Sequence, residues 1–238
     1  MKFGLKIGDQ EYSIPDYYTL GQWAKMNQWD MRDPNDWPFL MADALGIGNP
    51  APLMQMKIED EIKFNFALSI VLSALDLKPK DLEPEIDGYK MMKLDEITLG
   101  TWVDLDVLAS ENKNQDKLFA KLYDMPLETA KEIPITRALP ALKMYSDWRR
   151  SIYRSYSALF DYKDINEGED LSLGNKSMTP AHAWYETIMV LCSGNFRDLE
   201  YAIQRPFKEA FNYLAWKKTK MLEEQMELNK QKQKMKIK

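Results

Sequence analysis

Few residues in this sequence could carry out catalysis or bind a metal. His182 is the sole histidine and Cys192 the sole cysteine, and ten residues separate them. A nucleophile and its base must meet with a third group that orients the base, and a spacing of ten does not place both on one helix face. One histidine and one cysteine also fall short of a clustered zinc site. We therefore expect a surface or boundary His182 in a first helical turn and a small buried side chain at Cys192.

Acidic residues cluster at 59–61, 81–85, 104–106 and 167–170. Paired carboxylates can bind a metal or hydrolyse a glycosidic bond, but solvated faces and helix N-terminal charges are the commoner explanation. The run 174–177, Gly-Asn-Lys-Ser, is similar to the end of a phosphate-binding loop, but Glu169 stands where the upstream glycine is required. The sequence therefore predicts no catalytic, metal-binding or cofactor-binding residue and no enzymatic activity.

A five-residue motif occurs twice, at an offset of 79 residues. The copies are Thr19-Leu20-Gly21-Gln22-Trp23 and Thr98-Leu99-Gly100-Thr101-Trp102. Each copy predicts a helix start, because a threonine oxygen can accept from the unpaired N–H groups of a first turn and a glycine there lets another backbone approach. Each copy is followed by a polar turn, a short helix, a proline break and a long apolar helix. We therefore predict two helical halves related by an internal duplication; two unrelated amphipathic helix starts are the alternative.

The hydrophobic pattern predicts a mainly α-helical fold with a short N-terminal β-hairpin. Residues 3–14 alternate as a hairpin does, and its edge strand is a candidate partner site. Expected helices cover 19–29, 36–45, 58–75, 98–108, 118–122, 136–160, 180–192 and 196–203, and a last one begins at 205.

Polar and proline-marked stretches suggest where the chain divides. The predicted parts are a hairpin plus helical half at 1–78, a connector at 79–93, a second helical half at 94–162, a C-terminal helical region at 178–216 and a basic helical tail at 217–238.

Composition limits the kinds of partner. Residues 217–238 carry a net charge of +5, so the remaining residues carry −10 of the total of −5. An acidic body argues against broad nucleic-acid binding, and the basic tail is either a solvated helix end or a contact for an acidic partner. No apolar run approaches the ~20 residues of a membrane span, and the N-terminus lacks an apolar signal core. A single cysteine fits a reducing cytoplasm.

The tail carries one apolar stripe. Leu214, Met221, Leu228 and Met235 are seven residues apart, whereas the companion positions are Phe211, Lys218, Gln225 and Lys232. A stable coiled coil needs both sets to be apolar over several heptads. A single stripe suits weak docking, or a helix that orders on a partner; a fraying helix end is the alternative.

Several of these stretches resemble small tail-assembly and baseplate proteins of tailed bacteriophages. The predicted hairpin followed by Ile14-Pro15 and by 18–23 resembles their start, and 97–105 is similar to their opening TLGxWxDL. Trp184-Tyr185, the Gly194-Asn195 turn, and 205–214 with the charged tail resemble the C-terminal part of tail-assembly chaperones.

The resemblance implies a non-enzymatic virion assembly protein. Such a protein would chaperone or nucleate tail or baseplate assembly in the host cell cytoplasm by binding another tail or baseplate protein. A permanent structural component of the tail or baseplate, carried in the virion, is the alternative. No cofactor, metal or membrane is expected, and homo-oligomerisation stays open. The candidate protein-binding residues are Trp23, Trp102, Leu214, Met221, Leu228 and Met235.

Overall fold

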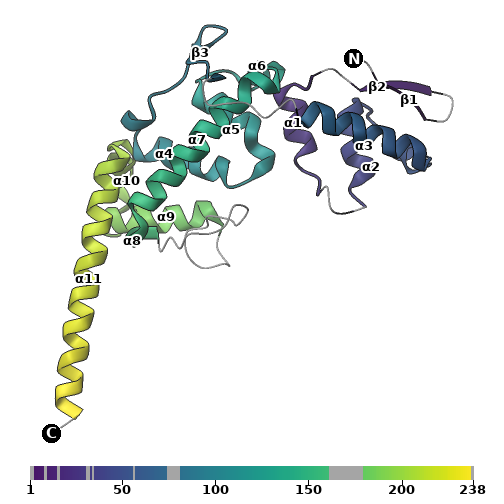
Figure 1. Ribbon diagram of the computed structural model, residues 1–238. Coiled ribbons are helices and arrows are strands. Elements are labelled where there is room, and N and C mark those ends of the chain that lie inside the picture. The colour runs from purple at the N-terminus through teal and green to yellow at the C-terminus, as the bar shows by residue number, and fades with distance from the viewer. Residues whose placement is uncertain are drawn as a thin grey trace. The chain divides into compact units, whose positions relative to one another are not determined.

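The computed structural model describes residues 3–7, 10–14, 17–30, 33, 35–55, 57–73, 81–160 and 179–236. Within these ranges the chain is mostly helical, as predicted, and its strands form two antiparallel two-stranded sheets (Figure 1). The predicted loop after residue 160 lies outside the described ranges, together with the carboxylates at 167–170 and the run at 174–177. Of the described helices, none has both the length and the apolar character needed to cross a membrane.

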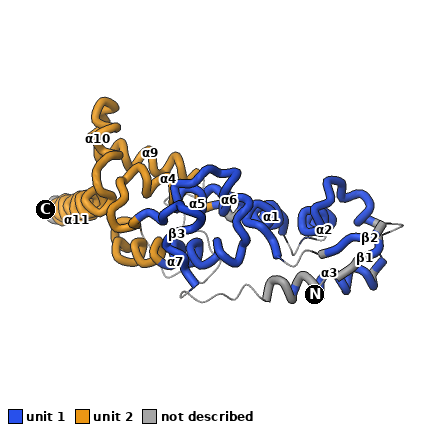
Figure 2. Tube along the Cα trace, turned by 90° about the horizontal axis from the view of Figure 1, so that it is seen from above, with its two compact units in different colours: residues 1–92, 111–147 blue, residues 93–110, 148–238 orange. Residues whose placement is uncertain are grey.

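Two compact units share the chain, and each is built from two separate stretches (Figure 2). Unit 1 comprises residues 1–92 and 111–147, and unit 2 comprises 93–110 and 148–238. This division differs from the predicted parts, since the predicted half 94–162 contributes to both units. The physical reason is that each motif helix packs on helices about a hundred residues further along the chain: α1 contacts α5 and α6 as well as α2, and α4 contacts α9, α10 and α11.

Unit 1 combines the first motif copy with helices that come after the second. Its elements are β1 (Phe3–Ile7), β2 (Gln10–Ile14), α1 (Leu20–Met26), α2 (Trp37–Leu45), η1 (Ala51–Gln55), α3 (Ile58–Ser73), β3 (Glu85–Ile86), β4 (Tyr89–Lys90), η4 (Asn112–Asn114), α5 (Gln115–Leu122), α6 (Leu127–Glu132) and the first part of α7 (Ile135–Ser155). Strands β1 and β2 pair with Ile7 opposite Gln10 and pack on α2 and α3. Helix α1 packs on α2, α5 and α6.

The broad apolar surface of α3 is not buried on every side. Phe64 is fully buried, whereas Ile62 and Phe66 are 64% and 61% exposed. The sequence pattern alone predicted burial on more than one side of this helix. It does not distinguish a helix with one packed face from a helix enclosed by neighbours.

Unit 2 is built around the second motif copy. Its elements are η3 (Leu94–Glu96), α4 (Leu99–Ala109), the last part of α7, α8 (Ser157–Phe160), α9 (Pro180–Leu191), η5 (Phe196–Asp198), α10 (Leu199–Gln204) and α11 (Phe207–Lys236). The core is an aromatic cluster around Trp102, whose ring lies 5.0 to 6.2 Å from four others. These belong to Trp148, Tyr153, Phe207 and Phe211. The second half of α11 extends beyond the other helices of the unit (Figure 1).

Candidate protein-binding surfaces

Both motif copies begin their helices with a threonine cap, as predicted. The Thr19 hydroxyl accepts from the Gln22 N–H at 3.3 Å, and the Thr98 hydroxyl accepts from the Thr101 N–H at 3.2 Å. In the first copy the Gln22 side chain also accepts from the Thr19 N–H at 3.0 Å, which completes a capping box. The cap fixes the direction in which each motif helix leaves the preceding chain.

In unit 1 the motif is bound to the start of a distant helix by two backbone hydrogen bonds. The Leu20 N–H donates to the Ile133 carbonyl at 2.8 Å, and the Ile135 N–H donates to the Tyr18 carbonyl at 2.9 Å. The two bonds lie on either side of Pro134, which forms an isolated antiparallel bridge with Thr19. This bridge attaches α1 to the junction between α6 and α7.

Unit 2 repeats the arrangement with different residues. The Leu99 N–H donates to the Arg205 carbonyl at 2.8 Å, and the Phe207 N–H donates to the Ile97 carbonyl at 3.2 Å. Pro206 bridges to the motif threonine as Pro134 does in unit 1. The bridge here attaches α4 to the junction between α10 and α11.

The motif glycines allow the close approach that the sequence predicted. A Cβ on Gly21 would lie 2.9 Å from the Lys131 Cβ, and a Cβ on Gly100 would lie 3.3 Å from the Ile203 carbonyl oxygen. Contacts this short require a shift of the neighbouring helix. Lys131 and Ile203 are each three residues before the bridging proline of their unit, so the two glycines face equivalent positions.

A second repeated pattern explains these contacts, and sequence analysis missed it. Residues 127–134 and 199–206 both read Leu-Glu-x-Ala-x-x-x-Pro, at an offset of 72 residues. Each pattern forms the short helix and the proline junction on which one motif copy docks. The pattern is readable in the sequence, but the copy on which each motif docks lies about a hundred residues beyond that motif.

A short hairpin covers part of unit 1 where a connector was predicted. Asp87 and Gly88 have positive φ angles of 52° and 88°, as a type I′ turn between two antiparallel strands requires. Ile86 is fully buried, and the Met92 N–H donates to the Leu122 carbonyl at 2.8 Å. The Asp-Gly pair was a readable turn signal, but the strands on either side are only two residues long.

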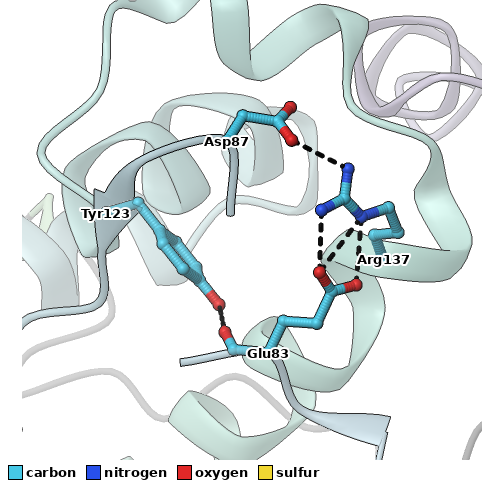
Figure 3. A network of polar contacts seen from close by, with 4 residues as sticks. All are labelled: Glu83, Asp87, Tyr123 and Arg137. Atoms are coloured by element: carbon cyan, nitrogen blue, oxygen red, sulfur yellow. Dashed lines mark hydrogen bonds and ion pairs between the residues drawn. The ribbon is translucent and has the colours of Figure 1, made fainter. Parts of the chain in front are cut away.

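Arg137 holds this hairpin through Glu83, which precedes β3, and through Asp87 in the turn (Figure 3). Its guanidinium lies 2.7 Å from the Glu83 carboxylate and 3.2 Å from the Asp87 carboxylate. The Tyr123 hydroxyl donates to the Glu83 carbonyl at 2.5 Å. The hydrogen bond from Arg137 lowers the pKa of the Glu83 carboxyl below its usual value, and burial raises the pKa of Tyr123 to about 12.

Replacing Arg137 with Gln should loosen the hairpin without unfolding unit 1. The ion pair is about one-third exposed on both sides, so its loss should cost below about 1 kcal/mol. We expect faster hydrogen exchange at the Met92 amide, which closes the hairpin on Leu122. Lys131→Gln, which breaks an exposed pair with Glu128, is the control and should leave that amide unchanged.

The same attachment should weaken as the pH falls. Because folding lowers the pKa of Glu83, its stabilisation is present above the unfolded pKa and is lost as the pH drops through the folded pKa. The Arg137→Gln chain should lose this acid dependence when the Gly88 amide shift is followed by NMR. An identical acid transition in both chains would contradict the assignment.

The second half of α11 carries a stripe of exposed apolar side chains, which we call the tail stripe. Its members are Met221, Leu222, Met226 and Leu228, which are 47% to 60% exposed. The same helix face buries Phe207, Phe211 and Leu214 in the core of unit 2. The Lys218 ammonium donates to the Leu159 carbonyl at 3.2 Å. The apolar face of α11 therefore continues past the body of the unit and into solvent.

The predicted protein-binding residues fall into three groups. Met221 and Leu228 belong to the tail stripe, as the prediction requires. Trp102 is fully buried and Leu214 is 5% exposed, so both pack the core of unit 2 and neither is available to a partner. The half-buried Trp23 donates from its indole to the Gln115 amide oxygen at 3.0 Å. Met235 lies in α11, but its side chain is outside what the structure describes.

Unit 2 also contains a buried polar cluster centred on Asp106. Asp106 is 2% exposed and accepts three hydrogen bonds from side chains on other helices. The donors are Arg149 at 2.6 Å, Trp184 at 2.7 Å and Tyr153 at 2.8 Å. Sequence analysis treated 104–106 as a solvated acidic cluster, which was wrong for Asp106. Both carboxylate oxygens of Asp106 accept hydrogen bonds inside the core. These bonds hold α4, α7 and α9 together.

The residues considered for chemistry lie apart from one another. His182 is exposed in the first turn of α9, 3.0 Å from the Thr179 hydroxyl. Cys192 is a buried free cysteine at the other end of that helix, and burial raises the pKa of its thiol. Within the described ranges no three His, Cys, Asp or Glu side chains gather as a metal site would require.

No family model, curated protein or solved structure matches this chain.

Proposed function

We propose that this protein is a non-enzymatic assembly protein of a bacteriophage tail or baseplate, and that it binds another tail protein through the tail stripe. The observation that carries the proposal is the exposed apolar face of α11. The resemblance of the motif copies and of the C-terminal region to tail-assembly chaperones supports the kind of partner. The host cell cytoplasm is where such assembly takes place.

The tail stripe has the physical character of a docking helix. Its four side chains lie on one face, and the remaining positions from 217 to 236 are mostly Lys, Glu and Gln. An amphipathic helix of this kind binds by laying its apolar face into a groove of the partner. Full burial of one Met or Leu side chain contributes about 1.5–3 kcal/mol before the cost of association is subtracted. Four side chains therefore suit a reversible complex, which a chaperone needs in order to release its client.

Replacing two of the four stripe residues should weaken partner binding while the protein stays folded. In Met221→Gln combined with Leu228→Gln, glutamine keeps the helix propensity and removes two exposed apolar contacts. The matched control, Lys220→Gln combined with Glu227→Gln, changes the opposite face and leaves the net charge unchanged. We expect at least a tenfold loss of affinity for the tail-protein client in the first chain only, measured by titration calorimetry. Equal affinities in both variants would remove the tail stripe from the proposal.

The alternative, a permanent structural component, differs in whether the protein is retained in the finished particle. Quantitative mass spectrometry of purified particles beside the infected-cell lysate separates the two. A chaperone is abundant in the lysate and absent from particles, whereas a structural component has a fixed copy number in each particle.

We also propose that the two units descend from an internal duplication. Besides the caps, glycines and proline bridges, a further pair of contacts occupies equivalent positions. The Asn27 amide donates to Gln115 at 3.3 Å, and the Trp184 indole donates to Asp106 at 2.7 Å. Asn27 and Asp106 are 79 residues apart, which is the offset of the motif itself. The repeated segments are interleaved along the chain, since both motif copies precede both proline junctions.

A further inference from the structure

We draw no further inference here: the strongest candidate, the open groove of about 750 Å³ that unit 2 forms between the end of α9, α10 and the start of α11, carries nothing, because no part of the described chain shows what covers it.

Discussion

Replacing Asp106 with Asn should destabilise unit 2 by about 3–5 kcal/mol, the usual cost of removing one member of a buried ion pair. The carboxylate is 2% exposed, and its partner Arg149 is 9% exposed. The substitution keeps the shape of the side chain and removes its charge, so the buried guanidinium loses this counter-charge at 2.6 Å. Hydrogen exchange of α4 and α9, followed across a urea series, reports on unit 2 without assuming that both units unfold together.

An exposed pair with the same geometry provides the control. Lys208 and Asp95 also lie 2.6 Å apart, but their side chains are 45% and 71% exposed. Asp95→Asn should cost less than about 1 kcal/mol, because water replaces the lost partner. Similar costs for the two variants would mean that the Asp106 cluster is solvated in solution, and that burial is not what makes it important.

The features predicted correctly from the sequence are local ones. The threonine caps, the close approach at the motif glycines and the Thr179-Pro180 helix start each depend on a few neighbouring residues. A cap requires a particular side chain at one position, because the backbone geometry of a first turn already presents the unpaired N–H groups to it. Such features are readable without knowing what packs against the helix.

The errors come from contacts between distant parts of the chain. The spacing of Leu99, Trp102 and Asp106 places all three on one face of α4, so the face was predictable. The burial of this face was not predictable. It depends on Arg149 and Trp184, whose hydrogen bonds to Asp106 offset the cost of removing a carboxylate from water. Trp102 was assigned to a partner surface for the same reason. The aromatic residues that enclose it come mostly from α7 and α11.

The tail stripe on α11 was predictable because no other part of the described chain packs over it. A seven-residue repeat of Leu and Met is visible in the sequence, and the structure divides it into a buried member at Leu214 and exposed members at Met221 and Leu228.

Substitution of the motif glycines tests directly whether the two units dock their motif helices in the same way. Gly21→Val should destabilise unit 1 by about 1–3 kcal/mol, the usual cost of overpacking, even though valine is a better helix former than glycine. The added Cβ alone would lie 2.9 Å from the Lys131 Cβ and 3.2 Å from its carbonyl oxygen. Neither atom is the free end of a flexible side chain, so α6 itself must move.

Gly100→Val should have the same kind of effect on unit 2, because its Cβ would lie 3.3 Å from the backbone carbonyl of Ile203 on α10. Gly48, which has nothing within 4 Å, is the control, and Gly48→Val should change stability by less than about 0.5 kcal/mol. Hydrogen exchange assigns each loss to its own unit. If both motif variants proved as harmless as the control, the helices would not be docked through these glycines, and the equivalence on which the proposed duplication depends would fail with them.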